Sequence, residues 1–304
     1  MATPIRTTFD NTTNKELFKR NLELLFDTTD REAIVESDRL YIQKPGTDLY
    51  ERIMRIAGLP RGYEVSEGQE IPQYSPKIGT TKDLTQKTFG LGFRFSWLFK
   101  KTEKWDLAAT WAKNLIMNQK ELKDVELAKL WNSPTATYTG FDSQVLGHAS
   151  HTCLDDNSST YDNIISAALS TTALESAKYY FETLKDDQGA TWFAKPDLLY
   201  HAPALEFTAW EIFKSSGKAH ELSNTANYWQ NKWEPFMYHR LTSSTAWGLI
   251  ARNHPKYNVL CYTLSDADRI VRDAPDNSRD TIMDSLQAFC WGFGDGRMVC
   301  IGNT

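Results

Sequence analysis

The feature that most limits the fold is a helical pattern of about 28 residues at positions 103–131. Proline at Pro134 marks the end of this pattern, because proline cannot continue a helix. Such a helix measures roughly 42 Å, which is too long to be covered by one small domain, so the chain must contain an elongated part. Its apolar side chains recur on one face: Trp105, Ala108, Ala112, Leu115, Leu122 and Val125.

The segment before this helix predicts a projection. Residues 61–88 are rich in Gly, Pro, Thr and charge and offer no wide apolar face, although residues 63–65 and 83–85 alternate as strands do. We therefore expect a long hairpin leaving the body. Long loops in compact domains are functional or disordered, and ordering by a partner and plain mobility both remain open. Residues 89–99 carry aromatics at alternate positions, which predicts a strand.

Shorter patterns complete a mixture of helices and strands. Helices are expected at residues 14–26, 49–57, 170–184 and 204–215. Strands are expected at residues 197–201, 233–238, 246–251, 259–263 and 287–292. Residues 292–296 contain Asp-Gly, which supplies the positive φ angles of a tight hairpin turn. Interspersed helices and antiparallel strands predict the α+β class.

Charge and cysteine spacing exclude several kinds of protein. The net charge of −5 and the lack of a basic stripe argue against a dedicated DNA-binding protein. Four cysteines lie far apart without a C-x-x-C pair, so we expect buried or half-buried free thiols in a reducing cytoplasm: Cys153, Cys261, Cys290 and Cys300. No apolar run approaches the roughly 18 residues that span a bilayer, and the polar start lacks a signal-peptide pattern.

The sequence lacks the common catalytic motifs, including a P-loop, H-E-x-x-H and a G-x-S-x-G elbow. The Gly90-Leu91-Gly92 stretch lies inside an aromatic strand, where glycines permit close backbone approach. Two carboxylate pairs lie beside turn signals, which favours capping or a solvated surface: Asp186 with Asp187, and Asp266 with Asp268. We expect no catalytic site and no cofactor.

One cluster could bind a metal. His148, His151 and Cys153 lie close together in a polar loop, and Asp155 or Asp156 could complete a ligand set. A rigid third or fourth ligand is not evident, so a solvated loop is the preferred interpretation. The prediction is therefore no metal site, with a metal-dependent enzyme kept as an alternative.

The order of these features resembles the major head proteins of tailed bacteriophages, which have the HK97-like fold, and particularly the Mu-like head subunit group. Residues 50–60 are similar to the entry of that family's E-loop, residues 89–96 to its returning strand, and residues 103–131 to its spine helix. Further similarities cover most of residues 14–300: Gln144 to His151 followed by Asn163 and Leu169-Ser170, the strand–Pro–helix pattern of residues 195–206, and Phe289-Cys290-Trp291-Gly292.

The resemblance implies an α+β HK97-like capsid fold in four parts. Residues 1–48 are expected to form an N-terminal arm, and residues 49–102 an E-loop region with a hairpin at about 61–99. Residues 103–137 correspond to the spine helix and peripheral domain. Residues 138–304 correspond to an axial domain with returning peripheral strands, in which residues 204–247 lie near the capsomer centre.

The resemblance also implies a function. Such a chain assembles with itself as hexamers and pentamers into an icosahedral shell around phage double-stranded DNA, with a separate scaffold protein and a portal protein as partners and no membrane. The acidic charge suits weak, non-specific contact with DNA. The protein is expected in the virion after assembly in the host cytoplasm. An encapsulin-like cellular compartment and a plain soluble oligomer remain alternatives.

Two sets of residues are expected to contact neighbouring subunits. The E-loop set makes ion pairs, each weak if exposed: Glu64, Glu67, Glu70, Lys77, Lys82 and Lys87. The arm set packs apolar side chains on a neighbour: Leu17, Phe18, Leu22 and Phe26.

Overall fold

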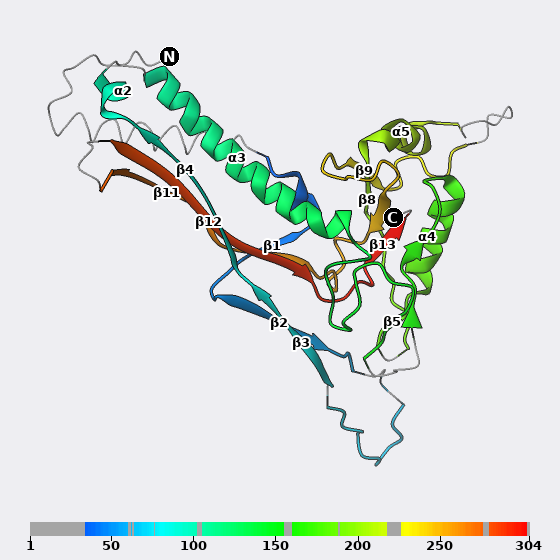
Figure 1. Ribbon diagram of the computed structural model, residues 1–304. Helices are drawn as coiled ribbons and strands as arrows, with labels where there is room; N and C mark the ends of the chain where they lie inside the picture. Colours follow the sequence, from blue (N-terminus) through cyan, green and yellow to red (C-terminus); the bar gives the residue numbers. More distant parts are fainter. Residues whose placement is uncertain are drawn as a thin grey trace.

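The computed structural model describes residues 34–59, 62, 64–75, 77–101, 105–154, 160–187, 189–217, 226–275 and 280–302. Figure 1 shows an elongated wing, a body on one end of it, and a hairpin that leaves their junction. The predicted helix at 14–26, with Leu17, Phe18, Leu22 and Phe26, lies outside the described residues.

The wing is built on a four-stranded sheet with the order β1-β11-β12-β4. Its strands are β1 (Ile42–Pro45), β4 (Lys87–Phe95), β11 (Val259–Asp273) and β12 (Thr281–Phe293). β1 is parallel to β11, and the other pairs are antiparallel. The strands predicted at 259–263 and 287–292 are correct but too short. In the outer half of β12 every second residue is buried, but two of these three, Thr281 and Ser285, are polar, so the sequence shows no apolar period there.

The long helix is confirmed as α3 (Trp105–Asn132), which lies along the sheet (Figure 1). Near its start, Ala112, Leu115 and Ile116 pack on Met283 of β12. The predicted face is wrong farther along: Leu122 is half-buried and Val125 is exposed, whereas three polar side chains are buried, Gln119, Lys123 and Asp124.

These buried polar side chains lie where the sheet is irregular. The pairing of β11 with β12 shifts register twice between residues 263 and 268. Gln119 Nε2 donates to the carbonyl of Ser285 over 3.2 Å, and Lys123 Nζ donates to Thr263 Oγ1 over 3.3 Å. Gln287 of β12, which lies opposite the shift, donates to the carbonyl of Gln119 over 3.0 Å, whereas Asp124 accepts from the amide of Ser37 over 2.9 Å. Hydrogen bonds therefore satisfy polar groups that this face of the helix buries.

The body contains a five-stranded sheet with the order β7-β13-β10-β8-β9. Its strands are β7 (Ile164–Ile165), β8 (Leu198–His201), β9 (Glu234–Met237), β10 (Trp247–Ile250) and β13 (Val299–Gly302). The body also contains helices α4 (Thr171–Thr183) and α5 (Glu206–Lys214), the 3-10 turn η2 (Pro203–Leu205) and a small sheet of β5 (His151–Thr152) and β6 (Thr160–Tyr161). The 3-10 turn η1 (Glu36–Arg39) contacts α3 and β1. The helices predicted at 170–184 and 204–215 are confirmed.

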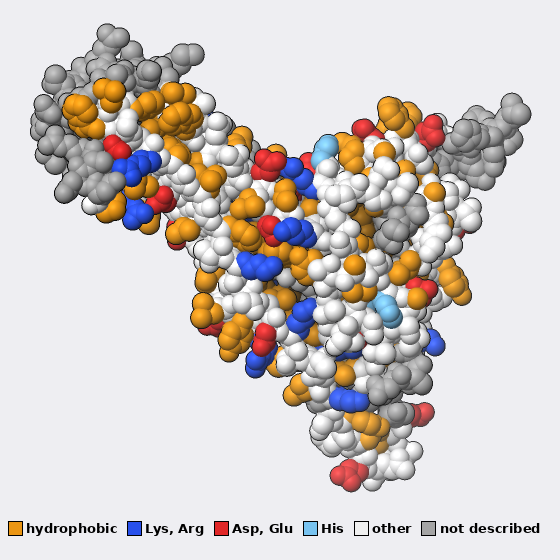
Figure 2. Space-filling view, viewed as in Figure 1, with side chains coloured by type: hydrophobic (Ala, Val, Ile, Leu, Met, Phe, Trp, Pro, Cys, Tyr) orange, Lys and Arg blue, Asp and Glu red, His pale blue; other side chains and the backbone are white. Residues whose placement is uncertain are grey.

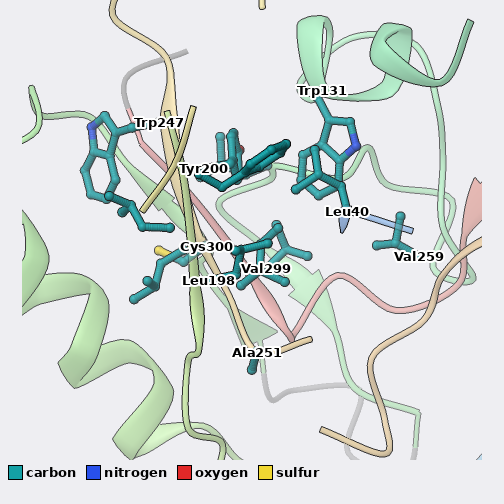
Figure 3. Close-up of a cluster of buried hydrophobic side chains, with 14 of the residues drawn as sticks. Leu40, Trp131, Leu198, Tyr200, Trp247, Ala251, Val259, Val299 and Cys300 are labelled. Carbon is teal, nitrogen blue, oxygen red and sulfur yellow. The ribbon is translucent and has the colours of Figure 1, made fainter. Parts of the chain in front are cut away.

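Wing and body share one core. Figure 3 shows Trp131 from the end of α3 beside Tyr200 of β8, with Leu40, Val299 and Cys300 close by. The rings of Trp131 and Tyr200 lie 4.9 Å apart, centroid to centroid. All four cysteines are free and buried, as the spacing predicted. Because the end of the long helix is part of the body's core, the wing is fixed to the body.

Gly302 marks the tightest packing in this core. A Cβ atom there would overlap the ring of Trp247, which is held in place because its Nε1 donates to the carbonyl of Ala167 over 2.9 Å. We expect Gly302→Ala to lower the free energy of unfolding by about 1–3 kcal/mol through overpacking. Gly58→Ala is the matched control, since among the described residues no atom lies within 4 Å of its Cβ position. Equal urea midpoints for the two variants would show that the added Cβ atom at position 302 does not clash with Trp247.

The hairpin corrects two predictions. Residues 49–57 do not form a helix: β2 (Tyr50–Ile56) pairs antiparallel with β3 (Ile78–Thr85). Burial alternates along β2, with Ile53 and Arg55 buried and Met54 and Ile56 exposed. This period of two is typical of a strand, and the distant β3 supplies the pairing that a local pattern does not reveal.

The returning strand of the hairpin is β3, not residues 89–99. β4 follows β3 directly and belongs to the wing sheet, where Gly90 and Gly92 lie close against Leu286 and Asp284 of β12, as expected for close strand approach. The strand ends at Phe95, and α2 (Trp97–Lys101) follows it. The hairpin turn predicted at 292–296 is also wrong, because this segment passes from β12 in one sheet to β13 in the other.

Candidate interaction surfaces

The projecting hairpin exposes an apolar surface. It consists of β2, β3 and residues 57–77 between them, and it extends away from both wing and body (Figures 1 and 2). Large contiguous apolar patches on soluble proteins indicate contact sites. Seven large apolar side chains of the hairpin are each more than half exposed: Tyr50, Met54, Ile56, Leu59, Ile71, Tyr74 and Ile78.

The six charged residues predicted as contacts divide into two groups. Glu64, Glu67 and Glu70 lie exposed in the connecting segment. The three lysines lie just before β3, in β3 and in β4, and each touches its own chain. Lys77 Nζ donates to the carbonyl of Leu154 over 3.1 Å, Lys82 Nζ lies 5.5 Å from the ring centre of Phe293, and Lys87 Nζ lies 4.5 Å from that of Trp291. The acidic group is therefore the one presented farthest from the body.

A buried ion cluster holds the base of the hairpin. Arg55 of β2 and Arg297, just before β13, both donate to Asp187 Oδ1; the distance from Arg55 Nη2 is 3.0 Å. We call Arg55, Asp187 and Arg297 the arginine clamp. Burial alone would raise the pKa of Asp187, but its interactions with Arg297 and Arg55 hold that pKa below its ordinary value. The clamp joins three segments that are distant in sequence.

The clamp corrects the prediction for the first carboxylate pair. Asp186 does cap a turn, because its Oδ1 accepts from the amide of Ala190 over 2.8 Å. Asp187 is buried, and it also accepts from the amide of Leu154 over 3.1 Å. The sequence contained no signal for this role, since neither arginine lies near Asp187 in the chain.

The histidine cluster has structural partners. His151 Nδ1 lies 2.6 Å from Asp142 Oδ2, and its ring stacks on Tyr161 at 4.7 Å. His148 Nδ1 accepts from the amide of Ser150 over 3.1 Å. Burial raises the pKa of the Cys153 thiol, which disfavours a reactive thiolate.

No metal-binding arrangement joins these residues. Within the described ranges, no three His, Cys, Asp or Glu side chains are placed to hold a metal ion. Asp155 and Asp156, the proposed further ligands, lie outside the described residues.

Two buried carboxylates give a prediction for acid stability. The pKa of Asp142 is lowered: burial would raise it, but the hydrogen bond and electrostatic interaction with His151, together with backbone amides including that of Gln144, more than offset this. The pKa of Asp187 is lowered as well. A carboxyl group whose pKa is lower in the folded than in the unfolded protein stabilises the fold. This stabilisation is complete above the pKa of the unfolded protein, about 3.9 for Asp. It is lost as the pH falls through the pKa of the folded protein.

We therefore expect the urea midpoint to fall between about pH 5 and pH 3. Asp142→Asn should make the urea midpoint depend less on pH in this range, because the substituted amide does not titrate. A wild-type midpoint that is constant over this range would contradict the assignment.

The far end of the wing carries a second apolar surface. Leu98 of α2 and Leu107 of α3 are exposed beside Trp111, whose ring stacks on Phe95 and Phe99 at 5.9 and 5.4 Å. The sequence predicted aromatics here but only as a strand face. Within the described part of the chain, no helix is long and apolar enough to cross a membrane.

Comparison with known proteins gives a result only at the level of structure. No family model matches the chain, and no curated protein matches it. A chain in the capsid structure of the cyanophage P-SCSP1u superposes with a TM-score of 0.57 at 10% identity, covering 86% of each chain. A chain in the procapsid of bacteriophage JBD30 has a TM-score of 0.53 at 10% identity, covering 96% of this chain and 75% of that one.

A chain in the mature capsid of bacteriophage PhiM1 has a TM-score of 0.52 at 15% identity, covering 86% of this chain and 84% of that one. The fold is thus an α+β capsid fold. More particularly, it is the HK97-like fold of phage capsid proteins, which the sequence predicted.

Proposed function

We propose that the chain is the major capsid protein of a tailed bacteriophage. It would assemble with itself as hexamers and pentamers into an icosahedral shell around double-stranded DNA. The observation that carries the proposal is the hairpin, on a fold shared with phage capsids. It exposes seven large apolar side chains, and three of them lie in the connecting segment that extends away from the body. A monomer gains nothing from such a surface, whereas a shell subunit needs many modest contacts.

The hairpin would lie over an adjacent subunit. Its apolar side chains would supply the buried anchors, which carry most of the energy of an interface. Glu64, Glu67 and Glu70 would add ion pairs at the rim that are individually weak and sensitive to salt. Lys77, Lys82 and Lys87 would contribute near the base. Leu17, Phe18, Leu22 and Phe26 would pack on a neighbour in the same way.

The parts of the chain would have different places in the shell. We assign residues 1–48 to an arm, 49–102 to the E-loop region, 103–137 to the spine helix and peripheral domain, and 138–304 to the axial domain with returning strands. Residues 204–247 would lie near the capsomer centre. The order of sequence features supports the Mu-like head subunit group as the relevant subgroup.

Other partners follow from this role. A separate scaffold protein and a portal protein would take part in assembly, which would occur in the host cytoplasm before the subunit enters the virion. Packaged DNA would touch the shell by weak, non-specific contact, in keeping with the net charge of −5. No catalytic activity, metal or cofactor is part of the proposal.

The alternatives have less support. An encapsulin-like compartment would use the same fold, but the capsid structures reported above belong to phages. A metal-dependent enzyme would need His148 and His151, whose Nδ1 atoms both have hydrogen-bond partners within the chain. Terminase and portal genes beside the coding sequence would distinguish a phage shell from a cellular compartment.

Electron microscopy in negative stain tests the proposal directly. The protein would be produced alone and together with the product of its neighbouring scaffold gene. Closed shells or capsomer rings in either preparation are expected. Uniform monomers or dimers in both preparations would overturn the capsid assignment.

A further inference from the structure

Helix α5 carries an exposed surface that is both aromatic and acidic. Phe207 is 81% exposed and Trp210 is 60% exposed, whereas the opposite face of the helix is buried in the body. Trp210 and Glu211 lie three and four positions after Phe207 and therefore share its face of the helix, and Glu206 is exposed beside them. Lys214, four positions after Trp210, is also exposed and donates to Asn231 Oδ1 over 3.4 Å, so two carboxylates stand against one lysine here. We call Glu206, Phe207, Trp210 and Glu211 the acidic aromatic surface; α5 lies on the outside of the body at the top right of Figure 1.

A second surface is aromatic and basic. Phe193 is 87% exposed in the segment between α4 and β8, and three exposed lysines share this region: Lys185, Lys195 and Lys256. The segment around Trp192 lies beside residues 254–256, because Trp192 stacks against His254 at 5.7 Å and Lys256 Nζ lies 5.9 Å from the Trp192 ring centre. We call Lys185, Phe193, Lys195 and Lys256 the basic aromatic surface.

Two carboxylates, Asp186 and Asp197, lie near this surface, and its three lysines outnumber them. Asp186 is engaged by the amide of Ala190. Asp197 accepts from the amide of Arg252 over 2.6 Å, and from the side chain of Asn253. These carboxylates are therefore held in local turns.

The two surfaces lie at different ends of the same strand. The basic aromatic surface precedes β8, and α5 follows it after one 3-10 turn. The pairing of Ile250 with Leu198 brings residues 251–256 to the first end, and the pairing of Trp247 with His201 lies at the other. The surfaces therefore do not overlap, so one copy of the chain can use both at once.

We propose that the acidic aromatic surface of one copy packs on the basic aromatic surface of the next. Trp210 and Phe193 would be the anchors, with Glu206 and Glu211 facing Lys195 and Lys256. A contact between two different patches is heterologous and closes into a ring when its rotation allows. This inference rests on the proposed function, and it identifies the contact that would join subunits within a capsomer.

Cysteine crosslinking tests the contact. The native cysteines are buried, so a short bismaleimide reports introduced ones. A mixture of Trp210→Cys and Phe193→Cys subunits, assembled together, should yield dimers that contain one of each. The double variant should yield a ladder of multimers. Tyr179→Cys, at an α4 position whose native side chain is 68% exposed, replaces Phe193→Cys in the control mixture. Crosslinking of Trp210→Cys with the control at the same yield would overturn the proposal.

Charge reversal tests the pairing independently of crosslinking. Glu206→Lys with Glu211→Lys should reduce the yield of rings and shells at least tenfold, as should Lys195→Glu with Lys256→Glu. Mixing the two variants should restore rings of alternating subunits, and circular dichroism would establish that each variant is folded.

The outcomes separate this inference from the proposed function. If wild-type protein forms no rings or shells, the capsid assignment fails. If wild-type protein forms shells and both reversed variants assemble equally well, the capsid assignment stands and this contact is wrong.

Discussion

Closing the hairpin with a two-residue turn should abolish shell formation while leaving the subunit folded. In this variant, Asn-Gly replaces residues 58–76. The closure is compatible with the strands because the amide of Ala57 already donates to the carbonyl of Lys77 over 3.0 Å, and Asn-Gly suits a two-residue hairpin. The variant loses Leu59, Ile71, Tyr74 and the three exposed glutamates but keeps the strands β2 and β3.

Sedimentation and negative-stain microscopy would measure the effect. A matched control keeps the full loop and changes only Glu64, Glu67 and Glu70 to Gln. Exposed ion pairs contribute little individually, so the control should assemble with a modest loss that depends on salt. Shells from the shortened variant at wild-type yield would show that the hairpin is not an assembly element.

Substitution of Asp187 should destabilise the subunit more than any change at an exposed ion pair. Asp187→Ala leaves two guanidinium groups, of Arg55 and Arg297, buried without their shared carboxylate. The side chains of Asp187 and Arg297 are 8% and 1% exposed. Arg297 keeps an ion pair with Asp295 Oδ2 at 3.4 Å, so the uncompensated charge would be that of Arg55. Leaving such a charge in a poorly solvated site costs about 3–5 kcal/mol.

Urea unfolding would measure this cost, with Asp83→Ala as the control. Asp83 pairs with Arg52 over 2.7 Å on the same hairpin, but the two side chains are 41% and 54% exposed. Loss of such a surface pair costs about 0–1 kcal/mol. Similar losses for Asp187→Ala and Asp83→Ala would mean that the clamp does not hold the hairpin base.

Local patterns in the sequence predicted where the main helices lie. Examples are α3, although its buried face was predicted correctly only near its start, and α4, where Ser170 Oγ accepts from the amide of Ala173. The resemblance to capsid proteins predicted the fold. Residues 49–57 were assigned to a helix because a short apolar run with an exposed face fits either period, and only pairing with β3 decides between them.

The candidate surfaces were predicted less completely. The long polar stretch indicated a projection. Which of its charged residues lie in the projecting segment and which lie on a strand depends on where β3 begins, and the sequence does not show this. The arginine clamp could not be predicted, because Arg55, Asp187 and Arg297 meet only through tertiary structure. Phe193 and Phe207 have the composition of core residues, and their exposure follows from the placement of the segments that carry them.

The strand order also determines when a newly synthesised chain can complete its two sheets and associate with neighbouring subunits. β1 pairs with β11, β4 pairs with β12, and β10 pairs with β13. Residues near 42 and 87 therefore cannot form their strand pairs until residues near 260 and 289 have been synthesised. Contacts of such large sequence separation slow folding, because loop closure precedes their formation. During synthesis, neither sheet can be completed until residues 281–302 have left the ribosome. A nascent chain therefore cannot present a finished wing or body to its neighbours, and premature association on the polysome is suppressed by topology alone.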